Sequence, residues 1–229
     1  MGASVTDHRQ PVRPPATRLL TVLASAVLAG AGFGALTSLV NGVSDHYADF
    51  ESRQATTGGT SPVEIASVLL DSGWAWAGAA VAIGWLVTRA TKNLPVALTH
   101  GAVAGVLALL AATGAYGLTD TIRNEATYPW YESESPLWWV ASFVLGAPLG
   151  AIGACIKRPG WTGLLARLTV PVGAAAQMIV LPPGRNERIT TIGQAVVLTA
   201  AAALSGFVIV RFLRTERRRP TPLTPTGPD

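Results

Sequence analysis

Asp71 is a carboxylate inside an apolar run long enough to cross a bilayer. A charged side chain at the centre of a membrane costs roughly 2.5 to 3.5 kcal/mol on insertion scales, so such residues often mark a functional site. A carboxylic acid in an apolar site can stay protonated and donate to an alkene or epoxide, and aromatic faces such as Trp74 and Trp76 stabilise the resulting cation. These residues predict protonation-initiated cyclisation of a prenylated substrate that enters from the lipid, with Asp71 as the proton donor.

Further polar and aromatic residues are expected at the same end of the protein. On a continuous helix, Glu64, Ser67, Asp71 and Trp74 would share one face. We expect one of three other acids, Glu64, Asp120 or Glu125, to assist Asp71 in catalysis. Aromatic and amide side chains would line the substrate site: Trp74, Trp76, Tyr116, Tyr128, Trp130, Trp138, Gln177 and Gln194.

Two other interpretations of these residues remain open. Acids beside aromatic walls also suit a cationic or planar solute, as in a transporter or a six-helix substrate-capture subunit of a vitamin uptake system. Alternatively, Asp71 is a structural hydrogen-bond partner in a protein that only binds lipid or a protein partner. Trp and Tyr residues at helix ends are then an aromatic belt at the membrane interface.

Sequence motifs for other chemistry are missing. The single cysteine, Cys155, excludes an intramolecular disulfide and a cysteine-based metal cluster. The chain has no G-x-x-x-x-G-K-[ST], H-E-x-x-H or G-x-S-x-G motif, and no paired Asp-rich motif for diphosphate-bound magnesium. We therefore expect no metal and no cofactor, and an ionisation-type prenyl transferase is disfavoured.

The composition is that of a membrane protein. Apolar residues make up 49% and charged residues only 13% of the chain, whereas soluble domains carry about 25% charged residues. The net charge is +4, but the basic residues cluster at the ends of apolar runs, which favours orientation in a membrane over binding of nucleic acid. Membrane lipid is therefore an expected partner, and nucleic acid is not.

The predicted fold class is all-α, a bundle of six transmembrane helices. Residues 1–18 are expected to be a disordered basic arm, 19–213 the transmembrane domain, and 214–229 a basic, proline-rich tail. The six predicted helices are 19–40, 62–87, 94–118, 136–156, 161–181 and 189–213. Three glycine pairs predict close helix contacts: Gly30/Gly34, Gly101/Gly105 and Gly146/Gly150.

The distribution of basic residues predicts the orientation of the bundle. If both termini are cytoplasmic, four of the 17 Lys and Arg residues fall outside, which leaves 17 − 4 = 13 inside; the four are Arg53, Arg123, Arg185 and Arg188. This bias follows the positive-inside rule. It predicts a multi-pass protein of a bacterial cytoplasmic membrane with both termini in the cytoplasm.

Several short motifs carry a resemblance to known proteins. They include 70–73 (LDSG) followed by Trp76-Ala77, 114–117 (GAYG), 137–139 (LWW) and 146–150 (GAPLG). Through them the chain resembles a family of small polytopic membrane proteins of unknown function that is common in actinobacteria. In architecture and in its acid-plus-aromatic cluster it is also similar to the small membrane-bound terpene cyclases of actinobacterial terpenoid pathways. That similarity implies an isomerase or lyase of terpenoid biosynthesis.

Overall fold

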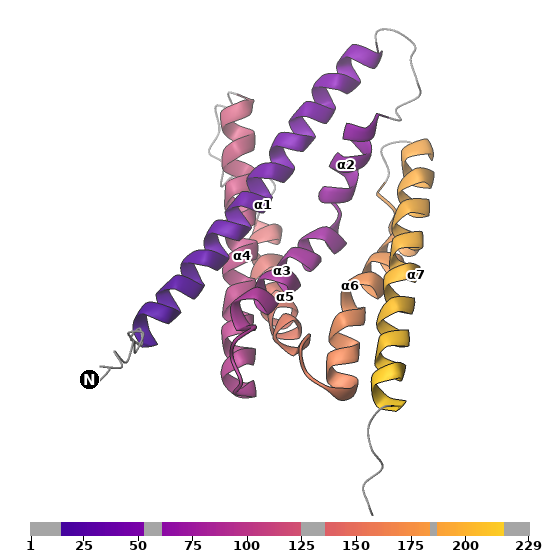
Figure 1. Cartoon of the computed structure of the whole chain (residues 1–229). Coiled ribbons are helices and arrows are strands. Elements are labelled where there is room, and N and C mark those ends of the chain that lie inside the picture. The colour runs from indigo at the N-terminus through magenta and orange to yellow at the C-terminus, as the bar shows by residue number, and fades with distance from the viewer. Residues whose placement is uncertain (1–14, 53–60, 125–135, 184–186, 218–229) are drawn as a thin grey trace, which may run out of the picture.

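The computed structural model describes residues 15–52, 61–124, 136–183 and 187–217, all of them helical or in short connections (Figure 1). This part of the chain contains seven α-helices and no strand. The helices are α1 (Pro15–Ser52), α2 (Pro62–Leu70), α3 (Gly73–Thr88), α4 (Leu94–Arg123), α5 (Pro136–Cys155), α6 (Gly160–Val180) and α7 (Glu187–Arg217).

Most of these helices meet the length and hydropathy that a membrane span requires. Five of them qualify alone, namely the 20–44 segment of α1 and the whole of α4, α5, α6 and α7. The pair α2 and α3 qualifies as one span bent by 62°, which gives six spans if the pair is counted together. The predicted all-α fold is therefore confirmed for the described residues, and its helices are long and apolar enough for five membrane spans, or six with the bent pair counted as one.

The predicted second helix, 62–87, is wrong as one continuous helix because the chain breaks at Asp71 and Ser72. Asp71 caps the end of α2 by donating its backbone N–H to the Ser67 carbonyl oxygen at 2.9 Å. Ser72 is extended, with φ −74° and ψ 141°, and its Oγ donates to the Val68 carbonyl oxygen at 2.6 Å. Asp and Ser side chains compete with the helix for backbone partners, and the glycine that follows adds backbone freedom. The single face expected for Glu64 and Trp74 is lost with the bend.

Several helices extend beyond their predicted apolar segments. Helix α1 continues through much of the predicted loop 41–61, α4 runs to Arg123, and α7 runs from Glu187 to Arg217. Hydropathy marks where the membrane ends, whereas the backbone hydrogen bonds of a helix can continue into water. The start of α1 at Pro15 also overlaps the predicted arm.

The chain crosses back and forth between two ends of the bundle (Figure 1). One end holds the α3–α4 and α5–α6 turns and the end of α7, and it carries six basic residues: Arg89, Lys92, Lys157, Arg158, Arg214 and Arg217. We call this the basic end. The break between α2 and α3 lies toward the opposite end, as does the last turn of α4.

Glycines bring the backbones of neighbouring helices into contact. A Cβ built on Gly30 or Gly34 would overlap the carbonyl oxygens of Ala108 or Ala112 in α4. Likewise, a Cβ on Gly105 would overlap the Gly146 carbonyl oxygen in α5. The close contacts predicted for the three glycine pairs are confirmed.

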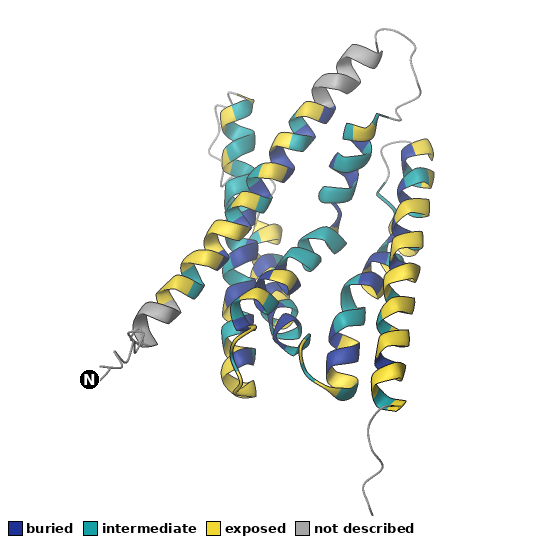
Figure 2. Cartoon of the chain, viewed as in Figure 1, coloured by how far each residue is buried: buried dark blue, intermediate teal, exposed yellow. Residues whose placement is uncertain are grey.

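The core is built from small side chains, and it lies where these helices cross (Figure 2). One cluster of buried side chains joins α1, α3 and α4 through Ala26, Ile83, Ala104 and Ala108. A second cluster joins α6 and α7, which lie side by side in Figure 1, through Ala174, Met178 and Val197. Helix α3 connects the two clusters because Trp74 packs against the second.

Candidate functional site

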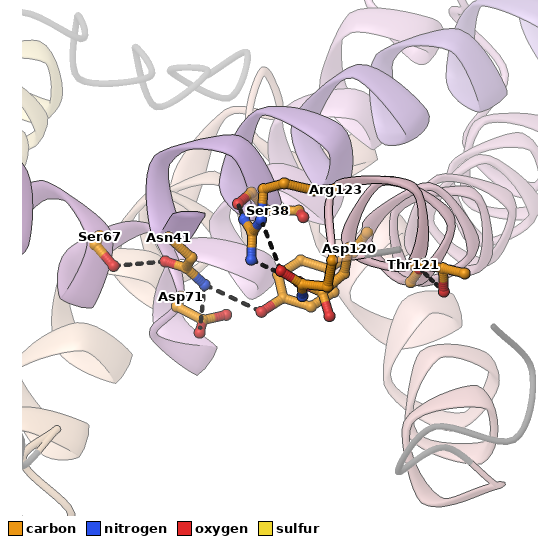
Figure 3. Close-up of polar contacts among 10 residues, drawn as sticks. Ser38, Asn41, Ser67, Asp71, Asp120, Thr121 and Arg123 are labelled. Atoms are coloured by element: carbon orange, nitrogen blue, oxygen red, sulfur yellow. Dashed lines mark hydrogen bonds and ion pairs between the residues drawn. The ribbon is translucent and has the colours of Figure 1, made fainter. Parts of the chain in front are cut away.

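A network of hydrogen bonds at the α2–α3 break links Asp71 to two other helices (Figure 3). Its centre is Asn41 of α1, a buried residue. The Asn41 Nδ2 donates to Asp71 Oδ2 and to the Tyr116 hydroxyl, both at 3.0 Å. The Asn41 Oδ1 accepts from Ser67 Oγ at 2.5 Å. We call these four residues the Asn41 network; it connects α1, the end of α2 and α4.

Sequence reasoning missed Asn41 because it was assigned to the start of a loop. A usable signal was present, since α1 carries polar residues at spacings of three and four that bring them to one side of a helix. All of them are buried: Thr37, Ser38, Asn41 and Ser44. A buried polar side of a membrane helix indicates partners on neighbouring helices rather than lipid contact.

Asp120, one of the acids expected to assist Asp71, is paired with a cation. Its Oδ1 accepts from Arg123 Nη2 at 2.8 Å, and Arg123 Nη1 also donates to the Ser38 carbonyl oxygen of α1. A Cβ on Gly42 would overlap the Arg123 guanidinium, so the absence of a side chain there lets Arg123 lie against α1. Asp120 lies one turn beyond Tyr116 on α4, so this ion pair lies next to the Asn41 network, on the side away from the basic end (Figure 3).

Glu64, the second assisting acid, serves the start of α2. Its carboxylate accepts from the Ser61 backbone N–H at 3.3 Å, and Ser61 Oγ accepts from the N–H groups of Val63 and Glu64. This capping box satisfies backbone donors that a helix start leaves open. Glu64 is buried and lies seven residues before Asp71, roughly 10 Å along the helix.

The expected aromatic wall is divided between two sides of α3. Trp76 lies between Phe33 of α1 and Tyr116 of α4, with ring centroids 5.5 Å and 6.1 Å away. Trp74 packs instead against the cluster of α6 and α7. Phe33 was not predicted as a site residue, although it belongs to the same aromatic group as Trp76 and Tyr116.

The two predicted amides connect helices on the α6–α7 side. Gln177 Oε1 accepts from the Trp74 backbone N–H at 2.7 Å and so caps the start of α3 from another helix. Gln194 Nε2 donates to the Met178 carbonyl oxygen at 2.8 Å. Both connections are interhelical and polar, as is common in membrane bundles.

Of the four remaining predicted site residues, only Trp138 lies in the described part of the chain. Trp138, at the start of α5, is 56% exposed, which suits an interfacial aromatic belt. Glu125, Tyr128 and Trp130 lie outside the described residues. Among the described residues, no group of three or more His, Cys, Asp or Glu side chains is placed to hold a metal ion.

The depth of the Asn41 network can be judged from α4. At about 1.5 Å per residue, Tyr116 lies roughly 33 Å from the start of α4 at Leu94. A hydrocarbon core is about 30 Å thick. If α4 starts at one face of the hydrocarbon core, the network would lie near the opposite boundary between hydrocarbon and headgroups, where Asp71 is exposed.

Comparisons with protein-family models, with curated proteins and with solved structures found no match to this chain. The resemblance to actinobacterial membrane proteins and to terpene cyclases therefore stays a prediction.

Proposed function

We propose that this protein is a multi-pass protein of a bacterial cytoplasmic membrane that binds a small organic cation at the α2–α3 break. The observation that carries the proposal is an exposed carboxylate, Asp71, at the interruption of a membrane helix and next to aromatic rings. In transport proteins, interrupted helices typically form ion and substrate sites, because the ends of the half-helices expose backbone dipoles.

The charges around the break favour a cation. The carboxyl-terminal end of α2 carries a partial negative charge, and Asp71 adds a carboxylate at that point. The amino-terminal end of α3 carries the opposite partial charge, but the Gln177 oxygen already meets its Trp74 N–H. A bound cation would therefore meet more negative than positive potential at Asp71.

One aromatic residue, Tyr116, lies close to the same cation, and Trp76 packs against it. Asp71 Oδ2 and the Tyr116 hydroxyl oxygen are each 3.0 Å from Asn41 Nδ2, so they are at most 3.0 + 3.0 = 6.0 Å apart. The Trp76 ring centroid is 6.1 Å from that of Tyr116. Cations within about 6 Å of an aromatic face are attracted to it. A primary or quaternary ammonium paired with Asp71 suits this combination of groups.

The orientation of the bundle follows from its charges. We infer from the positive-inside rule that the basic end is cytoplasmic; the start of α1 and the end of α7 would then lie on the cytoplasmic side. The Asn41 network then faces the opposite side of the membrane. Capture of a solute from outside the cell is the role that this orientation supports.

A membrane-embedded cyclase is the second candidate function, and the aromatic trio of Phe33, Trp76 and Tyr116 favours it. In this mechanism Asp71 would protonate an alkene or epoxide of a prenylated substrate, and the trio would stabilise the carbocation. Glu64 and Asp120 already have partners in Ser61 and Arg123, so Asp71 would act with Tyr116 and Asn41 as its neighbours.

Cation binding is tested with the full chain purified in a neutral maltoside detergent, using tetramethylammonium and choline as probes. Quenching or enhancement of tryptophan fluorescence reports binding because Trp76 lies beside the site. We expect Asp71→Asn to weaken binding roughly tenfold or more, which corresponds to about 1.4 kcal/mol. The matched control is Glu187→Gln, an exposed acid in the first turn of α7, which should bind like the native protein. Equal binding by the Asp71→Asn protein would contradict the proposal.

The cyclase candidate is tested with membranes that contain the protein, incubated with farnesylated and epoxidised prenyl compounds. A new cyclised product, detected by mass spectrometry and lost in Asp71→Asn, is the result expected of a cyclase. Removal of a general acid typically lowers the rate about 10² to 10⁴-fold. Products that form equally well with Asp71→Asn would exclude Asp71 as the proton donor.

A further inference from the structure

A cavity of about 200 Å³ lies at the basic end, away from the Asn41 network. It is formed where α3 ends and where the α5–α6 turn begins. Its lining includes Trp85, Thr88, Arg89, Ala154, Lys157 and Arg158. It belongs to neither of the functions proposed above.

The lining of this cavity is cationic. Arg89, Lys157 and Arg158 contribute three positive charges, and no acidic residue lines it. Within the described ranges, the ion pair between Asp120 and Arg123 is at the other end of α4, and none of these three cations is paired with a carboxylate. Like charges gathered in one concave site repel one another and attract an anion.

The turn that carries two of these cations is held in place from three directions. Arg158 Nη2 donates to the Lys92 carbonyl oxygen of the α3–α4 turn at 3.2 Å. Arg167 Nε of α6 donates to the Ile156 carbonyl oxygen at 2.8 Å. A Cβ on Gly163 would overlap the Arg158 carbonyl oxygen, so α6 packs directly on the turn. The backbone of the turn and the Arg158 guanidinium are thus positioned before any ligand arrives, which lowers the entropic cost of binding.

The wall opposite this turn is equally fixed. A Cβ on Gly153 of α5 would overlap the Val81 carbonyl oxygen and lie 2.7 Å from the Trp85 backbone nitrogen. The Thr88 hydroxyl donates its proton to the Gly84 carbonyl oxygen at 2.7 Å, so that proton is not available to a ligand. Arg89 and Lys157 are exposed, so their charged groups are available to a ligand.

We propose that this cavity binds a single phosphate group. Guanidinium groups match the geometry of phosphate oxygens, and lysine adds a point charge. The volume is below the roughly 300 to 1,000 Å³ of pockets for drug-sized ligands, so a phosphate group fits where a nucleotide does not. The phosphate comes from a lipid headgroup or from free inorganic phosphate. Leu86, three residues before Arg89, is 46% exposed and offers an apolar surface beside the cavity for an acyl chain.

The test uses the full chain in neutral detergent and two probes that differ in the source of the phosphate. Inorganic phosphate is titrated by equilibrium dialysis. Phosphatidic acid is compared, by native mass spectrometry, with a diacylglycerol that has the same acyl chains and lacks only the phosphate. We expect Arg89→Gln combined with Lys157→Gln to weaken binding of the active probe roughly tenfold or more. The control pair, Arg214→Gln with Arg217→Gln, removes the same charge at the same end and should change binding less than about twofold.

Each outcome of this test decides the proposal. If the pair Arg89→Gln and Lys157→Gln removes binding of inorganic phosphate, the natural ligand of the cavity is free phosphate. If only phosphatidic acid binds, the ligand is a lipid headgroup. The charge-conserving pair Arg89→Lys and Lys157→Arg should keep binding within about threefold, which separates loss of charge from loss of fold. Equal weakening by the control pair, or no preference for either phosphate probe over diacylglycerol, would overturn the proposal.

Discussion

Replacing Gly150 with alanine is expected to destabilise the bundle by about 3 kcal/mol, at the upper end of typical overpacking effects. A Cβ on Gly150 would overlap the Gly101 carbonyl oxygen and lie 2.9 Å from the Gly105 Cα. Conversely, a Cβ on Gly84 of α3 would overlap the Gly150 carbonyl oxygen. Three helices therefore meet at Gly150 through backbone atoms, which cannot turn aside as a flexible side chain can.

This prediction has a matched control in Gly32→Ala on α1. A Cβ on Gly32 meets nothing within 4 Å. Its substitution should be neutral or stabilise by up to about 1 kcal/mol, because alanine is the better helix former. Thermal unfolding of the detergent-solubilised protein measures both variants. At about 2 to 4 °C per kcal/mol, Gly150→Ala should lower the Tm by about 6 to 12 °C. Similar Tm values for the two variants would show that α3, α4 and α5 do not meet at Gly150.

The second large effect is expected from Asn41→Leu, which keeps the approximate size of the side chain and removes three hydrogen bonds. Interhelical hydrogen bonds in membrane proteins average about 0.6 kcal/mol each, and reach about 1.7. In addition, the fully buried Ser67 hydroxyl would lose its acceptor, and an unsatisfied buried polar group costs about 1 to 3 kcal/mol. We expect a total destabilisation of about 2 to 3 kcal/mol.

A double substitution makes this prediction specific to the Asn41 network. Removing both partners of a buried hydrogen bond is far milder than removing one. Asn41→Leu combined with Ser67→Ala should therefore be more stable than Asn41→Leu alone, by about 1 kcal/mol. The control Asn124→Leu changes an exposed asparagine at the end of α4 and should leave Tm nearly unchanged. Simple addition of the two single effects, measured by thermal unfolding, would contradict the Ser67–Asn41 contact.

The sequence alone predicted the long apolar helices, apart from the break in 62–87, and it predicted their glycine contacts. Apolar runs near 20 residues long require helices, because backbone groups in hydrocarbon must bond within their own segment. The close helix contacts at Gly34 and Gly150 could be predicted in the same way, because small residues allow helices to approach one another in a membrane. These features depend on local composition, which is visible directly in the sequence.

The composition of the Asn41 network depends on contacts between distant segments. Asp71 was identified because an acid in an apolar run is visible in the sequence. The other members, Asn41 and Tyr116, lie 30 and 45 residues away from Asp71 in the chain (71 − 41 and 116 − 71). Their pairing depends on how α1, α2 and α4 cross, and no local pattern specifies that crossing.

Trp74 and Trp76 were expected to line one site, but residues two positions apart on a helix point about 200° apart around its axis, so the two rings cannot both face one cavity. The sequence determined that an acid and aromatic residues lie near one end of a helical membrane bundle. Only the tertiary structure decided that α2 and α3 are separate helices, that Trp76 packs against Tyr116 and Trp74 against the α6–α7 cluster, and that Asn41 connects Asp71 to Tyr116. The physical reason is that helix bends and interhelical hydrogen bonds are chosen by packing among segments far apart in the chain.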